Sequence, residues 1–360
     1  MKSSTSTGTA AGAEFAAAWS RADEDKSIAQ PRIKANLAVH VLMERARIHR
    51  LERDCAVWVT ALDILGEMRR WSVVIVWLLA ACAQAQKATL TLTPELVVAG
   101  APEILRVSAP ADAHLEGDWD GRPLRFFPGR AANSWYAVAG VDVEAAPGPS
   151  TVPSTIRVAI HPHGERDSLP EIRETIAIHP AHYRTTSLTV APKFVEPDPE
   201  ALKRIKAEVE IKKKVWASSA DHPLWTGDFT VPVSSKATDS FGTRRMLNGK
   251  LAATHKGMDF RAASGTVVRA GNAGVVVLAQ PLYYEGNCVI VDHGDGLMSL
   301  YMHFSKIDVK AGQHVRNGER LGLSGATGRV TGPHLHWAIR WEGAMLDPAK
   351  VLKMDLDALR

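Results

Sequence analysis

The sequence predicts a mainly β chain that consists of an N-terminal antiparallel β-sandwich, a helical linker and a C-terminal β-rich domain. Short runs of alternating apolar and polar residues, separated by Gly and Pro, occupy residues 86–190 and again residues 227–352, before a tail at residues 353–360. This alternation is typical of half-buried strands. At residues 191–226, apolar residues recur instead at helical spacing. A length of 360 residues and an apolar fraction of 46% fit a globular chain of two domains.

Residues 68–85 have the three parts of a secretory signal. A positive start, MRR at residues 68–70, precedes the apolar run 71–81, and the AQA at residues 83–85 resembles a cleavage site. The apolar run is shorter than the roughly 20 residues that span a bilayer. Because such signals stand at an N-terminus, we expect translation to start at Met68 and residues 1–67 to be an artefactual upstream extension. The signal predicts export to the periplasm or cell envelope, and it disfavours a buried core helix or a cytoplasmic metalloprotein.

The three cysteines give no disulfide framework. Cys55 lies in the upstream extension, Cys82 lies in the signal, and Cys288 is the cysteine that remains in the expected mature chain. The run LAAC that ends at Cys82 resembles a bacterial lipobox, which would make this residue a lipid anchor. Cleavage after Ala85 is the competing interpretation.

The first β-rich region is predicted to be an accessory sandwich of about 100 residues. Runs such as TIRVAI at residues 155–160 supply its strands, and Gly and Pro residues supply its turns. The region carries no recognisable catalytic motif. Trp119, Trp135 and Tyr136 have the ring surface to stack on sugars, but we expect these aromatic residues to lie in the core.

The linker is predicted to contain one amphipathic helix. Pro199 suits a helix start, and Leu202, Ile205 and Val209 recur at helical spacing among Lys, Arg and Glu residues. The basic run at residues 212–214 is expected on a solvated face, and contact with an anionic wall polymer is the alternative.

The C-terminal domain contains a pattern of metal ligands. His255 and Asp259 are spaced as HxxxD, and His334 and His336 form an HxH motif later in the chain. Two imidazoles and one carboxylate suit a zinc ion and leave its fourth tetrahedral position open for water, which distinguishes catalytic from structural zinc. His303 lies between the two motifs, again outside any helical pattern. The sequence therefore predicts the metal centre of a hydrolase.

Strand geometry constrains how these residues meet. A fully extended strand would separate His255 and Asp259 by roughly 13 Å at about 3.3 Å per residue, so the chain must bend between them. We expect the bend at Gly257, because Gly permits backbone angles that other residues avoid. His334 and His336 are two residues apart, so both would face the same side of a strand.

Several further motifs accompany these residues in a fixed order. They are FGTRR at residues 241–245, NG at 248–249, HKGMD at 255–259, GN at 286–287, VDHG at 291–294, YMH at 301–303 and TGRVTGPHLH at 327–336. This combination, which extends from Phe229 to Leu352, resembles the lysostaphin/LytM-type zinc metallopeptidases, which cut peptide bonds in bacterial peptidoglycan. So many matches in order make the resemblance specific.

The resemblance implies that His255, Asp259 and His336 bind one zinc ion per chain. It implies that His303 and His334 stay off the metal and perform acid/base or oxyanion work, with their individual roles left open. The implied activity is that of an exported zinc metalloendopeptidase, which hydrolyses peptide cross-links of peptidoglycan with a zinc-activated water. A cross-link made directly to a diamino acid is the implied target.

The alternative function is a non-catalytic cell-wall-binding or amidase-activating module on the same fold. The complete set of ligands and histidines argues against it. The expected partners are peptidoglycan stem peptides, and a net charge of +4 gives no reason to expect a nucleic acid. The resemblance suggests a spacer, regulator or wall-docking module for the sandwich. The oligomeric state does not follow from the sequence.

Four neighbouring residues have less specific patterns. Asp292 and His293 lie in an Asp- and Gly-rich run that is typical of a tight turn, so a structural role is expected for both. Arg244 and Arg245 are equally compatible with contacts to substrate carboxylates and with an exposed turn. Cys288 is a mild departure from the family pattern and affects none of these expectations.

Overall fold

The computed structural model describes residues 88–146, 148–161 and 171–359. These residues belong to the second of the two compact units of the chain, Ala88–Arg360. The predicted upstream extension, the signal at residues 68–85 and Cys82 lie outside the described residues. In the described part the chain is mainly β, as predicted. No helix in that part is long and apolar enough to cross a membrane.

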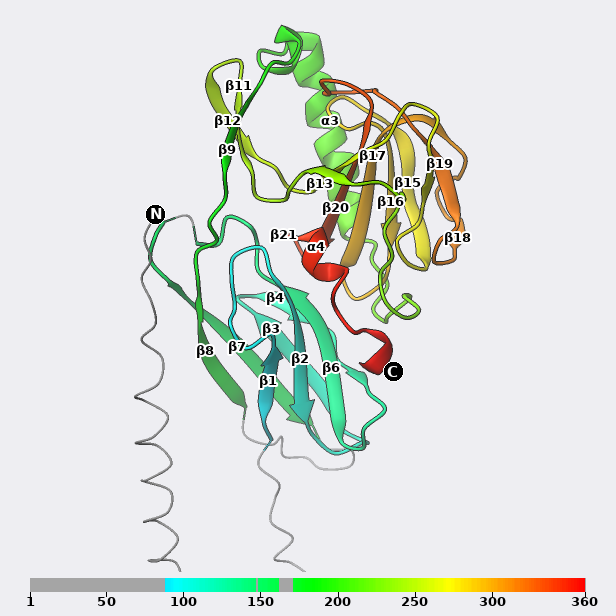
Figure 1. Ribbon diagram of the computed structural model, residues 1–360. Coiled ribbons are helices and arrows are strands. Elements are labelled where there is room, and N and C mark those ends of the chain that lie inside the picture. The colour runs from blue at the N-terminus through cyan, green and yellow to red at the C-terminus, as the bar shows by residue number, and fades with distance from the viewer. Residues whose placement is uncertain (1–87, 147, 162–170, 360) are drawn as a thin grey trace, which may run out of the picture. The chain divides into compact units, whose positions relative to one another are not determined.

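Two four-stranded antiparallel sheets form the N-terminal sandwich (Figure 1). One sheet has the order β1-β2-β6-β5, and the other has the order β4-β3-β7-β8. Leu105, Ile156 and Trp119 are buried in the core of the sandwich. The strands are β1 (Leu90–Thr93), β2 (Pro102–Ser108), β3 (His114–Trp119), β4 (Arg122–Leu124), β5 (Phe127–Pro128), β6 (Ser134–Gly140), β7 (Val152–His161) and β8 (Ile172–Ile178).

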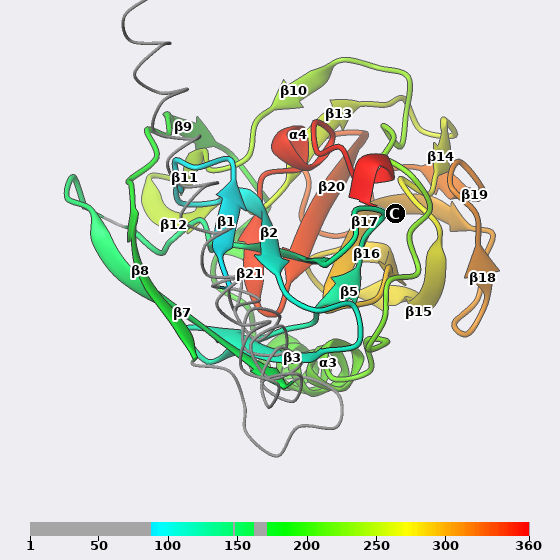
Figure 2. The same ribbon diagram turned by 90° about the horizontal axis from the view of Figure 1, so that it is seen from below.

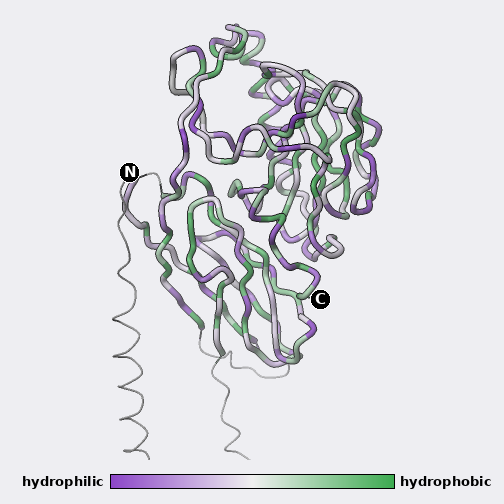
Figure 3. Tube along the Cα trace, in the orientation of Figure 1, coloured by the Kyte–Doolittle hydropathy of each residue, from purple (hydrophilic) through white to green (hydrophobic). Residues whose placement is uncertain are grey.

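The alternating sequence pattern has its expected structural effect along β7. Ser154, Ile156, Val158 and Ile160 are buried, and the residues between them are partly exposed. Figure 3 shows the same exchange of hydrophobic and hydrophilic residues along many of the strands. Because successive side chains point to opposite faces of a strand, one face of β7 fills the core and the other meets solvent.

A ten-stranded sheet forms most of the C-terminal domain. Its main path is β10-β13-β20-β17-β16-β15-β18, and Figure 2 shows β20, β17, β16 and β15 in succession. Val289, Tyr301 and Trp337 are buried in its core. The strands of the sheet are β10 (Ala237–Asp239), β13 (Met258–Arg261), β14 (Val267–Arg269), β15 (Gly274–Leu282), β16 (Gly286–Asp292), β17 (Leu297–Ile307), β18 (His314–Val315), β19 (Arg320–Ser324), β20 (His334–Trp341) and β21 (Ala344–Leu346).

A small three-stranded sheet, β12-β11-β9, joins the segment before the linker helix to the C-terminal domain. Strand β9 (Thr185–Leu188) runs parallel to β11 (Arg244–Leu247), which pairs with β12 (Lys250–Thr254). The Asn248 side chain adds two hydrogen bonds to this sheet. It accepts from the backbone N–H of Val190 and donates to the Val190 carbonyl, both at 3.0 Å. The sequence pattern grouped β9 with the sandwich, whereas its pairing partner belongs to the C-terminal domain.

The linker contains the predicted helix, α3 (Pro199–Trp216), preceded by the short 3-10 helix η2 (Pro192–Phe194). Asp198 caps α3 by accepting from the Ala201 N–H at 2.7 Å, and Pro199 occupies the first helical position.

The buried face of α3 differs from the predicted apolar face. Leu202 and Val209 are 46% and 40% exposed, whereas Glu208 and Val215 are buried. The Glu208 carboxylate accepts from the Tyr283 N–H at 2.8 Å and from Arg204 at 2.7 Å. A charged residue is buried here because its carboxylate has hydrogen-bond partners.

The C-terminal residues 348–359 pack onto the rest of the described unit. Helix α4 (Pro348–Val351) is followed by the 3-10 helix η3 (Asp357–Leu359), and Leu356 and Leu359 are buried. The Asp228 carboxylate accepts from the backbone N–H groups of Leu356 and Asp357, at 2.7 and 3.1 Å. Leu356 and Leu359, which lie in the predicted tail at residues 353–360, therefore contribute to the core.

One buried carboxyl group in the sandwich lacks a hydrogen bond. Glu103 on β2 is fully buried, and neither of its carboxyl oxygens has a hydrogen-bond partner among the described residues. Burial raises the pKa of Glu103 to about 8, against an opposing effect of the Lys350 charge. The carboxyl group is therefore protonated in the folded protein at neutral pH.

We predict that Glu103→Gln stabilises the protein at pH 8 but not at pH 5. The folded-state pKa of about 8 lies above the ordinary value of 4.5, so wild-type stability falls as pH rises from about 4.5 towards 8. The neutral amide removes this loss, which the two pKa values put on the order of 4 kcal/mol at pH 8. Urea unfolding of both proteins at the two pH values measures it. An unchanged pH dependence in the variant would contradict the prediction.

Candidate metal centre

His255, Asp259 and His336 converge on one point. Asp259 Oδ1 lies 3.1 Å from His255 Nε2 and 2.8 Å from His336 Nδ1, and the two ring nitrogens are 3.0 Å apart. All three side chains are buried. Two imidazole nitrogens and a carboxylate oxygen at these spacings fit one cation with bonds of about 2.0–2.2 Å.

The chain bends within the HxxxD motif, as the sequence predicted, but the structure requires glycine at position 257 for a different reason than expected. Strand β12 ends at Thr254 and β13 begins at Met258, so His255 and Gly257 lie in the bend between them. Gly257 does not adopt a positive φ. A Cβ atom there would lie only 2.5 Å from His336 Nε2. The expectation of an unusual backbone angle was therefore wrong, since glycine is needed to let the His336 ring approach.

Strand pairing sets the other two ligands opposite each other. In the antiparallel pair of β13 and β20, Asp259 faces His336. His336 in turn faces Met302 on β17, and Asp259 faces Asp239 on β10. His334 lies two residues before His336 on the same strand, and both line the same groove as predicted.

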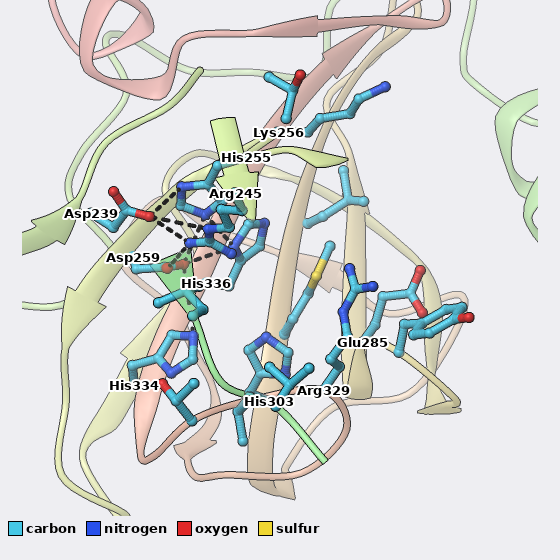
Figure 4. A pocket seen from close by; sticks show the side chains of 18 of the residues that line it. Asp239, Arg245, His255, Lys256, Asp259, Glu285, His303, Arg329, His334 and His336 are labelled. Atoms are coloured by element: carbon cyan, nitrogen blue, oxygen red, sulfur yellow. Dashed lines mark hydrogen bonds and ion pairs between the residues drawn. The ribbon is translucent and has the colours of Figure 1, made fainter. Parts of the chain in front are cut away.

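Asp239 and Arg245 surround the ligands with hydrogen bonds. Arg245 donates to Asp239 Oδ2 at 2.7 Å and to Asp259 Oδ2 at 2.5 Å (Figure 4). His255 Nδ1 donates to the Ser240 carbonyl at 3.0 Å, which directs its Nε2 towards the centre. Burial opposes ionisation of Asp259, but hydrogen bonds from His255 and His336 hold its pKa well below the ordinary value. The carboxylate is thus charged and available to a cation.

His303 and His334 lie beside the ligand set with their rings 4.9 Å apart. His303 Nδ1 donates to the Thr327 carbonyl at 2.8 Å, and His334 Nδ1 donates to the Gly332 carbonyl at 2.8 Å. These bonds leave Nε2 of each ring as a proton acceptor. His334 Nε2 lies 3.7 Å from Asp259 Oδ1.

A bulge in β17 positions His303. Its φ of 67° lies in the left-handed region, and the β16–β17 register shifts between Asn287 and Val289. Bulges redirect side chains and are common next to active sites. Burial, together with the charges of His336 and His334, lowers the pKa of His303 to about 3, so its ring is neutral at ordinary pH.

The centre lies in a groove of ≈ 930 Å³. Part of its wall is formed by Arg184, by Thr186 of strand β9, and by Lys212 and Trp216 of helix α3. Sequence reasoning missed Arg184, Thr186, Trp216 and Asp239, because they precede the motifs and approach them only through long-range pairing. Lys212, expected on a solvated face, instead lines the groove and pairs with Glu285. Arg329 also lines the groove, and its position inside TGRVTGPHLH was a signal that could have identified it.

The structure distinguishes the roles of the residues whose sequence patterns were less specific. His293 is fully buried; its Nδ1 contacts the Ala273 carbonyl and its Nε2 contacts Ser299 Oγ, both at 2.7 Å, away from the centre. Burial lowers the pKa of His293 to about 4. Of the two arginines, Arg245 lines the groove, whereas Arg244 is exposed and does not.

Comparisons with known proteins agree with this geometry. Residues 253–348 match the model of Peptidase family M23. The chain is 45% identical over 122 residues to the peptidoglycan DD-endopeptidase ShyA of Vibrio cholerae. This match covers 33% of this chain and 28% of ShyA. It is 28% identical to a Pseudomonas aeruginosa protein whose crystal structure is assigned to peptidase M23, with a TM-score of 0.55 and coverage of 71% of this chain and 94% of that chain.

The fold and the site together define a β-rich peptidase domain with a His/Asp centre. Residues 253–348 form a domain of peptidase family M23, which confirms the resemblance seen in the sequence. The match covers 28% of ShyA and 27% each of ShyB and ShyC from Vibrio cholerae, so the matched segment spans less than a third of these curated relatives.

We predict that zinc binding separates the histidines into two groups. His336→Ala removes a ligand atom and should reduce bound zinc from one ion per chain to a small fraction. His303→Ala and His334→Ala should retain one zinc per chain, because neither ring belongs to the converging set. Metal analysis of the purified variants measures this difference. Loss of zinc from either of the latter two variants would place that histidine among the ligands.

We predict that Arg245→Gln weakens zinc binding about 10-fold or more, because Asp259 loses the partner that orients it. Arg244→Gln is the matched control, since Arg244 lies on the same strand but is exposed. Competition with a chromogenic chelator gives both affinities. Equal affinities in the two variants would show that Arg245 does not support the centre.

Proposed function

We propose that this protein is a zinc-dependent endopeptidase that hydrolyses peptide cross-links of bacterial peptidoglycan. The observation that carries the proposal is the convergence of a three-residue ligand set and two further histidines in one groove. The match of residues 253–348 to family M23 supports a peptidase, and the name of the relative ShyA supports peptidoglycan as the substrate.

His255, Asp259 and His336 would hold one zinc ion. Their nitrogen and oxygen donors suit zinc, and three protein ligands are the number found in catalytic zinc sites. When bound, zinc lowers the pKa of a coordinated water and polarises a carbonyl group. Arg245 and Asp239 keep the carboxylate and the His255 ring in the required orientation.

His334 is proposed to accept and return the proton during hydrolysis. Its Nε2 lacks a hydrogen when Nδ1 donates to the Gly332 carbonyl, and this Nε2 lies 3.7 Å from Asp259 Oδ1, beside the ligand set. His303 is proposed to orient the reacting groups as a neutral acceptor, since its ring is buried and fixed by the Thr327 carbonyl. Both rings face the groove from one side of the ligand set (Figure 4).

A non-catalytic wall-binding or amidase-activating role is the alternative. It is disfavoured because the chain has all three ligand residues and both additional histidines in contact.

Action outside the cytoplasm is part of the proposal. It is supported by the signal-like residues 68–85 and by the cell-wall substrate named for the relative ShyA. Cleavage after Ala85 and lipid attachment at Cys82 remain the two proposed forms of the mature N-terminus. Mass spectrometry of that N-terminus distinguishes them.

We predict that residues 88–360, which form one compact unit, release peptides from isolated cell walls in a chelator-sensitive reaction. Restoring zinc should restore the activity. His303→Ala and His334→Ala should each lower the rate about 100-fold or more while retaining zinc. Chromatography of the released cross-linked and monomeric peptides measures cleavage. A zinc-loaded protein that releases nothing would favour the non-catalytic alternative.

A further inference from the structure

Arg329 lies in the loop between β19 and β20, five residues before His334. Its backbone N–H donates to the Tyr284 carbonyl at 2.8 Å, and its guanidinium carbon lies 4.7 Å from the centroid of the Tyr284 ring. The side chain is half-buried and lines the groove together with His303. Stacking on an aromatic face restricts the guanidinium group and leaves its in-plane N–H donors available.

The loop that carries Arg329 is fixed relative to the catalytic histidines. Thr327 accepts from His303 Nδ1 through its carbonyl, and its hydroxyl accepts from the Asn287 N–H at 2.9 Å. A Cβ atom on Gly328 would lie 2.3 Å from the Gly286 nitrogen, so the two backbones touch where both residues are glycine. The guanidinium therefore occupies a defined place beside His303.

Most of the other cations that line the groove already have an acidic partner. Arg184 and Arg245 pair with Asp239, and these pairs are on the metal side of the groove. The remaining paired cations are Lys212, with Glu285, and Lys256, with Glu144.

Arg329 forms no ion pair among the described residues. The acidic group that acts on it electrostatically is Glu285, whose Oε1 is held by Lys212 at 2.6 Å. Arg340 also lines the groove, stacked on Trp216, and forms no ion pair within the described part of the chain. It is, however, four residues beyond His336 along a strand, or roughly 13 Å. Arg329 is thus the cation with unused donors beside the proton-transfer histidines. In Figure 4 it lies across the groove from Asp239 and Asp259.

A direct cross-link places a carboxylate near the scissile bond when the diamino acid that supplies the amine is a diacid. When a D-alanyl carbonyl is joined to the amine of a diamino diacid, the alanyl carboxyl group is consumed in the amide. The nearest free carboxylate is then the one on the carbon that bears the scissile nitrogen. Arginine binds such a group with two parallel N–H donors.

We infer that Arg329 is a specificity-determining residue that binds the free carboxylate on the carbon bearing the scissile nitrogen. The inference rests on the proposed function, because it assigns a position on that substrate. It predicts that the enzyme distinguishes a carboxylate from a carboxamide at this carbon and that Arg329 is the source of the distinction.

The test uses two synthetic cross-linked peptide dimers that differ only in a carboxylate or carboxamide at that carbon. For zinc-loaded wild type we expect kcat/KM to be roughly 10- to 100-fold higher for the carboxylate dimer. Arg329→Gln should lose most of its activity on that dimer and little on the carboxamide dimer, which brings the ratio close to one. Arg329→Lys should retain part of the ratio, and the control Arg244→Gln should retain all of it.

Several outcomes overturn the inference. They are a wild-type ratio near one, an unchanged ratio in Arg329→Gln, and equal losses on both dimers, which would indicate a merely structural role. The wild-type ratio needs no variant, so a misfolded variant leaves the inference falsifiable. Failure of the proposed function is distinguishable, because zinc-loaded wild type would then cleave neither dimer.

Discussion

The site depends on the antiparallel pairing of β13 with β20. This register places Asp259 directly opposite His336, and the neighbouring pairs extend the row to Asp239 on one side and Met302 on the other. A one-residue slip would turn Asp259 or His336 to the opposite face of the sheet. The buried Trp337 and Phe260, which follow the two ligands on their strands, fix the register through the core. Packing on one face of the sheet thus determines the ligand geometry on the other.

The remaining groups join this row through local breaks in regular structure. The bend at Gly257 brings His255 to Asp259, and the bulge in β17 turns His303 towards the groove. The loop before β20 then holds both His303, through Thr327, and Arg329. The proposed division between metal ligands, proton-transfer residues and a substrate-binding cation follows from where each break occurs. Strands hold Asp259, His334 and His336. A bend, a bulge and a loop hold His255, His303 and Arg329, respectively.

The sequence predicted the elements that depend on local pattern. Alternation identified the sandwich strands, and HxxxD together with the second histidine of HxH contains the residues that converge in the centre. Long-range pairing was less accessible. Strand β9 looked like the end of the sandwich because its alternation carries no information about which strand it pairs with. The buried face of α3 was also mistaken, since one hydrogen-bond partner of the buried Glu208 is the Tyr283 N–H, which lies far away in the sequence.

The central claim is that one zinc ion is held by two histidines and one aspartate while two further histidines remain free. Zinc-edge anomalous diffraction from zinc-loaded crystals tests it most directly, because it locates the ion and its ligands together. The account predicts a single anomalous peak within bonding distance of His255 Nε2, Asp259 Oδ1 and His336 Nδ1. A peak elsewhere, or one bonded to His303 or His334, would contradict it.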